Sequence, residues 1–161
     1  MGKQYIVFFG IGKTTWCKSH LNWADLDISY YMLPEQKAII KLLYFYLRWD
    51  YNLLIGAGQY SAPIISQYAA APNKIGYFRP MSINIILPCP EMKNEIVNRI
   101  KNRTADMTEV NDICRMYDFS WKAIDAMPFD TKVYLKPGQY LSDIIDENGE
   151  YKSGVEVIYG K

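Results

Sequence analysis

Residues 4–15, Gln4-Tyr5-Ile6-Val7-Phe8-Phe9-Gly10-Ile11-Gly12-Lys13-Thr14-Thr15, decide the fold of this chain. A β-branched and aromatic run ends abruptly in glycines and a lysine, which predicts a strand over about 4–9, a loop, and a helix from Lys13 or Thr14. Glycines let backbone amides point into one concavity that binds phosphate oxygens. A lysine adds a positive charge, and a threonine hydroxyl is suited to Mg²⁺. This stretch therefore predicts a phosphate-binding loop.

The loop pattern departs from its usual form at its first position. A phosphate loop ordinarily has a glycine five residues before Gly12, and this chain has Val7 there. Either the loop is shortened after a longer strand, or its first turn lacks a glycine. The alternative interpretation of the whole stretch is an ordinary glycine-rich turn with a surface lysine.

The composition is that of one folded domain. Of the 161 residues, 50% are hydrophobic and 22% are charged, which excludes a disordered chain. The net charge of +1 gives no general nucleic-acid footprint, although it leaves room for a local basic patch. Three widely spaced cysteines (Cys17, Cys89 and Cys114) and one histidine (His20) fit neither a disulfide framework nor a metal site, which favours an intracellular location. We recognise no signal peptide and no apolar run that would span a bilayer, so we expect no membrane association.

Strand-like and helix-like segments alternate along the chain. Besides the first strand, we expect strands at 22–27, 52–56, 82–87 and 131–135, and an edge strand at 155–159. We expect helices at 13–21, 34–48, 62–71, 90–103, from Asp106 through about Ile124, and at 138–145. This alternation predicts an α/β fold, a parallel sheet with helices on both faces, whose ligands bind beyond the carboxyl ends of the strands.

Two aspartates and a glycine pair fall at those strand ends. Asp25 and Asp27 are two residues apart on an extended segment, so their side chains point the same way. One of them is suited to accept the proton of an attacking hydroxyl and the other to hold Mg²⁺ through water. The alternative is a solvated turn with a helix cap. Gly56-Ala57-Gly58 ends the third strand.

Basic residues lie on two later segments. Arg99 and Arg103 are four residues apart and share one face of a helix, where guanidinium groups suit phosphate oxygens, and Arg115 is placed to join them. The alternative is the general preference of basic residues for a helix C-terminus. Residues 73–80 mix basic and aromatic side chains, including Lys74 and Arg79, and either hold a nucleotide or anchor a loop.

These stretches together resemble the small P-loop kinases of the nucleoside, nucleotide and polynucleotide kinase group, over about residues 4–145. Gly10–Trp16 is similar to the phosphate loop of phage-type polynucleotide kinase domains, Ala24–Asp27 to the acceptor-side acidic motif, and Val97–Arg103 to the lid segment. The helix around Val110 to Tyr117 also fits. The resemblance implies a three-layer domain over 1–161 with five parallel strands in the order 2-3-1-4-5, a lid at about 99–115 and a C-terminal extension at about 146–161. It also implies ATP and Mg²⁺ as cofactors.

The resemblance further implies roles for individual residues. The residues that would bind the donor phosphates are Gly10, Ile11, Gly12, Lys13, Thr14, Thr15, Arg99 and Arg115. Thr14 and Asp25 would hold Mg²⁺. The catalytic residues would be Lys13, Asp27 as general base, and Arg103 on the transferred group. The acceptor would meet Asp27, Gln59 and Arg79.

Three functions stay open at this point. The first is a kinase acting on a nucleoside, a nucleotide or a nucleotide within DNA. The near-neutral charge favours a small acceptor, because DNA binding needs a basic groove, which Lys74 and Arg79 would have to supply. The second is a degenerate P-loop domain that binds nucleotide or a partner protein without turnover, favoured by Val7 and by a third strand that ends without an aspartate. The third is a kinase of a non-nucleotide small metabolite.

Overall fold

A computed structural model of the protein describes residues 2–27, 49–70 and 82–160. The expected helix at 34–48 and the basic segment at 73–80, with Lys74 and Arg79, lie outside the described residues. No helix among the described residues is long and apolar enough to cross a membrane.

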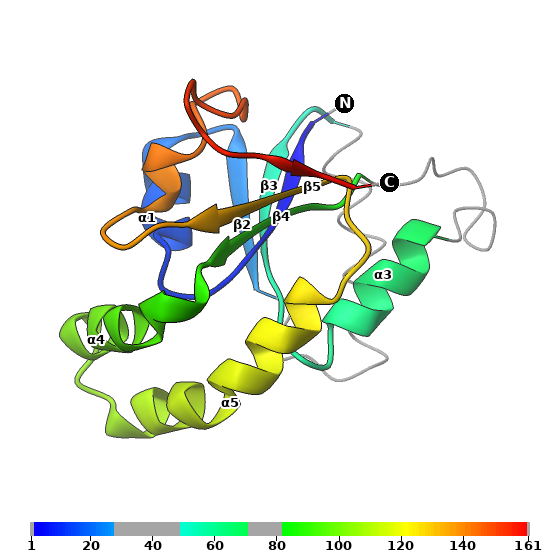
Figure 1. Ribbon diagram of the computed structural model, residues 1–161. Coiled ribbons are helices and arrows are strands. Elements are labelled where there is room, and N and C mark those ends of the chain that lie inside the picture. The colour runs from blue at the N-terminus through cyan, green and yellow to red at the C-terminus, as the bar shows by residue number, and fades with distance from the viewer. Residues whose placement is uncertain (1, 28–48, 71–81, 161) are drawn as a thin grey trace.

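One mixed sheet forms the centre of the molecule (Figure 1). Its strands are β1 (Gln4–Val7), β2 (Trp23–Asp27), β3 (Asn52–Gly56), β4 (Asn84–Pro88), β5 (Thr131–Leu135) and β6 (Ile158–Tyr159). The order is β2-β3-β1-β4-β5-β6, in which the first five strands are parallel and β6 is antiparallel to β5. The expectation of a purely parallel, five-stranded sheet is therefore corrected by a sixth strand, which lies inside the expected edge segment at 155–159.

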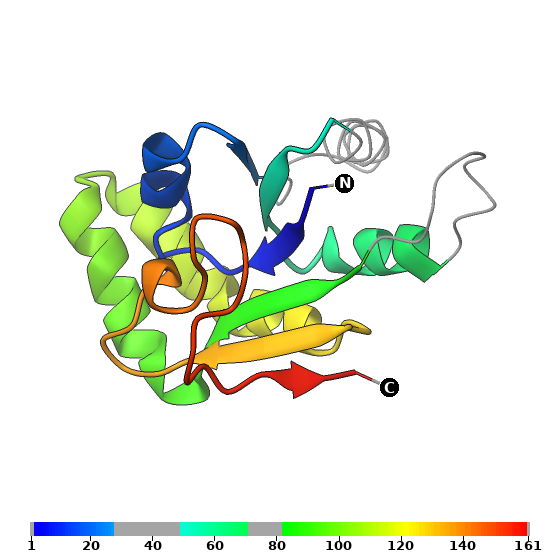
Figure 2. The same cartoon turned by 90° about the horizontal axis from the view of Figure 1, so that it is seen from above.

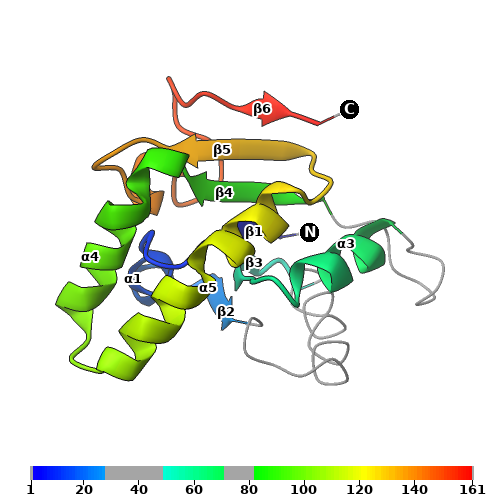
Figure 3. The ribbon, with the colours of Figure 1, turned by 60° about the horizontal axis from the view of Figure 1, so that its bottom comes forward.

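Helices cover both faces of this sheet. They are α1 (Lys13–Ser19), α3 (Ala62–Ala70), α4 (Lys93–Arg103) and α5 (Met107–Asp125), with short 3₁₀ turns η2 (Pro90–Met92) and η3 (Leu141–Asp143). Figure 3 shows α3, α4 and α5 in front of the sheet and α1 behind it, and Figure 2 shows η3 next to α1. Right-handed crossovers explain this division, because the chain moves from β1 toward one edge and from β3 toward the other.

The central strands are buried along their whole length. Every residue of β1 and β3 is buried, as expected for a parallel sheet that helices cover on both sides. The stripe predicted on the helix after Asp106 also faces the core. Its buried members are Val110, Ile113, Tyr117 and Ile124, and Cys114 and Trp121 pack against them. Asp106 caps this helix by accepting hydrogen bonds from the amides of Thr108 and Glu109.

The first strand is shorter than expected, because Phe8 and Phe9 leave it to pack on α5. The rings of Phe8 and Phe9 lie 4.9 and 5.7 Å from the ring of Tyr117. Val7 therefore ends β1, and residues 8–12 form a loop of five residues before Lys13. Of the two alternatives for this loop, the structure has the one whose first turn lacks a glycine.

The helix predicted at 138–145 was wrong, since only the 3₁₀ turn η3 forms there. Gly138 adopts φ +83°, a left-handed conformation that closes a turn after Pro137 and delays the start of any helix. The chain then leaves η3 at once, because Ile145 pairs with Tyr151 in an isolated antiparallel bridge. The turn expected at Asn148-Gly149 is confirmed, with Gly149 at φ +74° and its amide bonded to the Asp146 carbonyl.

Candidate functional site

The loop over residues 8–12 leaves the carboxyl end of β1 in the middle of the sheet. Gly10 and Gly12 have φ values of +76° and +100°, in the left-handed region that favours glycine. Gly10 is also needed for space, because a Cβ atom there would lie 2.9 Å from the Cγ2 atom of Ile96. The Gly12 carbonyl accepts the first hydrogen bond of α1 from the amide of Trp16. Both glycines of the motif are therefore required by the backbone path of the loop.

Three of the predicted site residues meet beside this loop. Lys13 begins α1, and its ammonium group forms an ion pair with Asp25 of β2. The hydroxyl of Thr14 donates a hydrogen bond of 2.8 Å to the second carboxylate oxygen of Asp25. The side chains of Lys13 and Asp25 are only 12% and 26% exposed, so the pair is largely shielded from water. A cation, a hydroxyl and a carboxylate thus form one cluster.

This cluster has the donor set that Mg²⁺ prefers. Mg²⁺ is held in proteins by oxygen ligands, commonly one or two carboxylates together with substrate phosphates. Thr14 and Asp25 supply a hydroxyl and a carboxylate within hydrogen-bond distance of each other. Both groups are oxygen donors of the kind that Mg²⁺ takes as ligands. The described residues contain no group of three or more His, Cys, Asp or Glu side chains that would hold a metal alone.

Asp27 lies at the carboxyl end of β2, opposite Gly56 of β3. Its carboxyl atoms are 3.1 to 3.3 Å from the point where a Cβ atom on Gly56 would lie. A side chain at position 56 would therefore push the carboxylate away. The predicted pairing of two aspartates on one strand holds, since Asp25 and Asp27 are two residues apart within β2 and share a face.

Arg99 reaches the loop from α4, and its guanidinium group is enclosed. It donates hydrogen bonds to the Gly10 carbonyl at 3.3 Å, the Gln139 carbonyl at 2.8 Å and the Glu95 carboxylate at 2.5 Å. Its Cζ atom lies 3.8 Å from the centre of the Tyr140 ring. The side chain is 11% exposed. Arg99 is thus next to the loop, as predicted, but its donors are bonded to protein atoms.

The other two predicted arginines bond acidic residues of α5. Arg103 ends α4, and its guanidinium lies 3.4 Å from the carboxylate of Glu109, with half of the side chain exposed. Arg115 is bonded to Asp112 at 2.9 Å and is three-quarters exposed. The structure therefore separates the arginine pair expected from sequence, because Arg99 is buried against the loop while Arg103 lies at the surface.

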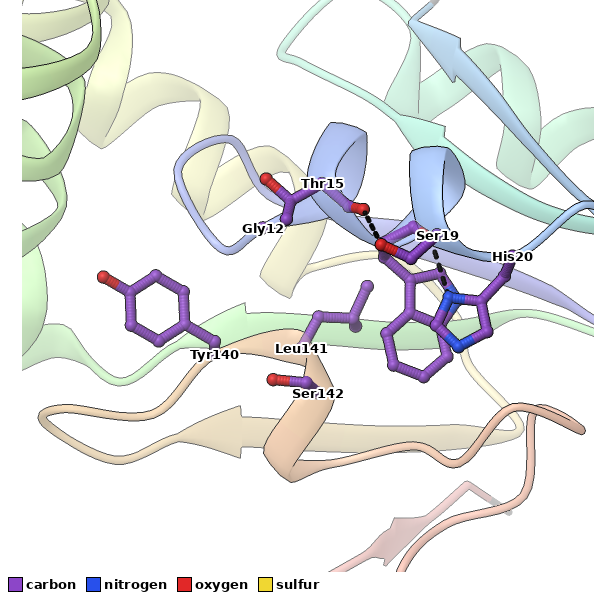
Figure 4. Close-up of a pocket in the computed structure, with 8 residues that line it drawn as sticks. Gly12, Thr15, Ser19, His20, Tyr140, Leu141 and Ser142 are labelled. Carbon is purple, nitrogen blue, oxygen red and sulfur yellow. Dashed lines mark hydrogen bonds between the residues drawn. The ribbon is translucent and has the colours of Figure 1, made fainter.

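A pocket of about 290 Å³ lies next to the loop, between α1 and residues 140–142 (Figure 4). One wall is α1, with Thr15, Ser19 and the stacked rings of Trp16 and His20, whose centres are 4.0 Å apart. The opposite wall is residues 140–142, which face α1 in Figure 4. Sequence analysis assigned only Gly12 and Thr15 of this pocket. The wall at Tyr140 was missed because this residue follows Gly12 by more than a hundred residues in the chain.

A second, narrower cleft lies at the ends of β1 and β3. It is bounded by Phe9, by residues 57–59, and by one face of α5 that includes Asp112, Ile113 and Met116. Gln59, predicted to contact an acceptor, lines this cleft. The α5 residues were missed, since their helical spacing indicated only core packing. Arg79, the remaining predicted acceptor residue, lies outside the described residues.

Cys17 reports on the charge of the cluster. Burial first, and then the nearby carboxylate of Asp25, raise the pKa of its thiol to about 11, while Lys13 opposes this rise. The thiol is therefore protonated at neutral pH. Sequence analysis gave Cys17 no role. In the structure, its thiol lies close enough to Asp25 for the carboxylate to raise the pKa of the thiol.

No family model, curated protein or solved structure matches this chain.

Proposed function

We propose that this protein is a small P-loop kinase, which transfers the γ-phosphate of ATP to a nucleoside, a nucleotide or a nucleotide unit in DNA. The observation that carries the proposal is the cluster of Lys13, Thr14 and Asp25 beside a five-residue glycine loop, at the carboxyl edge of parallel strands. Phosphoryl transfer requires a cation for the phosphates and oxygen ligands for Mg²⁺ at one point. The cluster supplies both.

Binding of ATP would exchange the partner of Lys13. In the structure, the Asp25 carboxylate accepts bonds from both Lys13 and Thr14. A terminal phosphate would replace Asp25 as the partner of Lys13, so one anion would substitute for another at a shielded ammonium group. Thr14 and Asp25 would then hold Mg²⁺, which neutralises phosphate charge when bound.

The pocket beside α1 is the candidate site for the donor base. It adjoins the loop through Gly12 and Thr15, and aromatic rings form part of its walls. Its volume is close to the lower end of the range for small-molecule sites, about 300 Å³. A planar heterocycle attached to a triphosphate on the loop would lie between α1 and residues 140–142.

The acceptor would approach from the opposite side of the loop. Asp27, on the same face of β2 as Asp25, is suited to accept the proton of an acceptor hydroxyl. The cleft that contains Gln59 and Asp112 offers hydrogen-bonding groups beside Phe9 and Met116, but its volume is only about 40 Å³, so it would have to widen to take a nucleobase. Arg103 would neutralise charge on the transferred group after leaving Glu109.

A second candidate function is nucleotide binding without turnover. It is favoured by one observation, namely that Arg103 and Arg115 are bonded to Glu109 and Asp112 of α5. If neither arginine leaves its partner, no described arginine other than Arg99 lies against the loop, and Arg99 is already bonded.

The decisive experiment is transfer from ATP labelled in its γ-phosphate to a panel of nucleosides, nucleotides, DNA oligomers and small metabolites, with Mg²⁺ and with a chelator. The proposal predicts Mg²⁺-dependent labelling of a nucleotide-type acceptor. Saturable ATP binding with no labelled product would favour the second candidate. Labelling of a non-nucleotide metabolite alone would keep the kinase and reject the acceptor class.

A further inference from the structure

Arg99 makes contacts with three separate segments around the loop. Its two terminal nitrogens bond the Gly10 carbonyl of the loop, the Gln139 carbonyl after β5 and the Glu95 carboxylate of α4. Its planar group also stacks on Tyr140. Because the charge is enclosed and already matched by Glu95, a phosphate would have to displace these bonds to reach it.

Glu95 completes this connection. It lies four residues before Arg99 on α4 and forms an ion pair with it. The same carboxylate accepts a hydrogen bond of 2.9 Å from the amide of Gly138. Two side chains of one helix thus hold the segment 138–140, which also forms a wall of the pocket beside α1.

Two carbonyls of the loop are held by Arg99 and by the segment that Arg99 and Glu95 contact. The Gly10 carbonyl accepts from Arg99, and the Ile11 carbonyl accepts from the amide of Leu141 at 2.9 Å. In a planar trans peptide, the carbonyl and the following N–H point in opposite directions. Fixing these two carbonyls therefore directs the amide of Ile11 away from Arg99 and the amide of Gly12 away from Leu141.

We infer that Arg99 is a positioning residue that orients the loop amides for phosphate, and that it does not itself bind the donor phosphates. This inference rests on the proposed kinase function for its role in ATP binding. It assigns to Arg99 the holding of the Ile11 amide directly, through the Gly10 carbonyl, and of the Gly12 amide indirectly, through the segment at Gln139 that leads to Leu141. Such preorganisation lowers the dissociation constant for ATP more than it raises kcat.

The first test measures the loop without any nucleotide. Hydrogen exchange of the amides at 10–14 and 138–141 is compared in the wild-type protein, Arg99→Lys, Arg99→Met and the control Lys101→Ala, an exposed cation on the same helix. Lysine lacks the planar fork and cannot bond both carbonyls. We expect both Arg99 variants to exchange about tenfold faster in these two segments, the effect of losing a charged hydrogen bond, and by a larger factor than in β4 and α5, whose exchange follows the global stability.

The second test measures ATP binding and turnover with the same variants. We expect the dissociation constant for ATP to rise about tenfold to hundredfold in Arg99→Met, less in Arg99→Lys, and kcat at saturating ATP to stay within about threefold. Unchanged loop exchange in both variants would overturn the inference. So would a large fall in kcat at an unchanged dissociation constant, which would make Arg99 a ligand of the transferred group.

The two tests separate this inference from the proposed function. If the wild-type protein binds no ATP, the kinase proposal fails, while the exchange measurement still decides whether Arg99 holds the loop. If the wild-type protein transfers phosphate but the variants have normal exchange, the kinase proposal stands and the inference about Arg99 fails.

Discussion

The glycine loop, residues 8–12, and the connection between α4 and α5 both contact arginines of α4, but they are built in opposite ways. In the loop, Phe8 is fully buried, and the carbonyls of Gly10 and Ile11 are bonded to Arg99 and Leu141. In the α4–α5 connection, residues 103–109, the Arg103–Glu109 pair is 3.4 Å long and at least a third exposed on each side. The loop carbonyls are therefore fixed by hydrogen bonds, whereas the ion pair of the connection is long and exposed.

This difference predicts different roles for Arg99 and Arg103, although their spacing in the sequence places both on the same face of α4. An exposed ion pair contributes only about 0–1 kcal/mol to stability, so Arg103 can leave Glu109 at little cost. Releasing Arg99 would break hydrogen bonds to two partly buried carbonyls and to a carboxylate at once, which costs more than one exposed ion pair. We expect Arg99 to act on binding and Arg103 on the chemical step.

The largest effect on activity is expected from removing the positive charge of Lys13, which follows the loop directly. Lys13→Ala should lower kcat/KM for ATP about 10³-fold, because removing one positioned charge or donor from a phosphoryl-transfer site has effects of this order. The measurement is steady-state kinetics with circular dichroism to establish folding, and Lys18→Ala, an exposed lysine on the same helix, is the matched control. Near-normal turnover by a folded Lys13→Ala protein would reject the phosphate loop.

A somewhat smaller effect is expected on the acceptor side. Asp27→Asn should lower kcat about 10²-fold while the dissociation constant for ATP changes little, since a general base acts on the acceptor proton. Kinetics and ATP titration on this variant and on Asp25→Asn separate the two carboxylates. If ATP binding collapses in Asp27→Asn but not in Asp25→Asn, the two aspartates have exchanged roles.

The comparison of the two arginines is tested most sharply by melting. Arg103→Ala should lower kcat about tenfold or more and leave the melting temperature within about 2 °C, because an exposed pair contributes little. Arg103→Lys should recover only part of the rate, as it lacks the bidentate fork. Arg99→Met should show the reverse, with a clear fall in melting temperature. A large loss of stability in Arg103→Ala with unchanged kcat would make Arg103 a structural residue.

The smallest effect concerns the thiol beside the cluster. Burial and Asp25 together raise the pKa of Cys17 to about 11, so only a small thiolate fraction is present at pH 8. Asp25→Asn removes the negative charge, lowers this pKa and should speed alkylation of Cys17, with the rate rising as pH increases. Mass spectrometry of the labelled peptides follows Cys17 apart from Cys89 and Cys114. A rate unchanged by Asp25→Asn would show that the carboxylate does not act on the thiol.

Much of the fold was predictable because it is written in local patterns. Continuous apolar runs such as Leu53–Ile55 mark strands that are buried on both faces, and the stripe on α5 marks its core side. Edge elements are less clearly marked. Ile158 and Tyr159 of β6 are 42% and 72% exposed, so burial hardly constrains where this strand begins. Leu141, Ile144 and Ile145 are spaced as in a helix, yet a 3₁₀ turn and a bridge bury them.

The site was predictable only where its chemistry lies in side chains. The proximity of Lys13, Thr14 and Asp25 was predictable, because the glycine-lysine loop and the second strand end at the same edge of a parallel sheet. The contacts of Arg99 were not predictable, because its partners include backbone carbonyls 89 and 40 residues away in the chain. Every residue has a backbone carbonyl, so a hydrogen bond to one cannot be predicted from the type of residue that provides it.

The central claim is that the loop and the cluster of Lys13, Thr14 and Asp25 bind the phosphates of ATP with Mg²⁺. Calorimetric titration of ATP into the wild-type protein, Lys13→Ala and Lys18→Ala, with and without Mg²⁺, tests it directly. We predict one saturable site that is tighter with Mg²⁺, is lost in Lys13→Ala and is kept in Lys18→Ala. Absence of binding to the wild-type protein at millimolar ATP, or equal binding to Lys13→Ala, would contradict the claim.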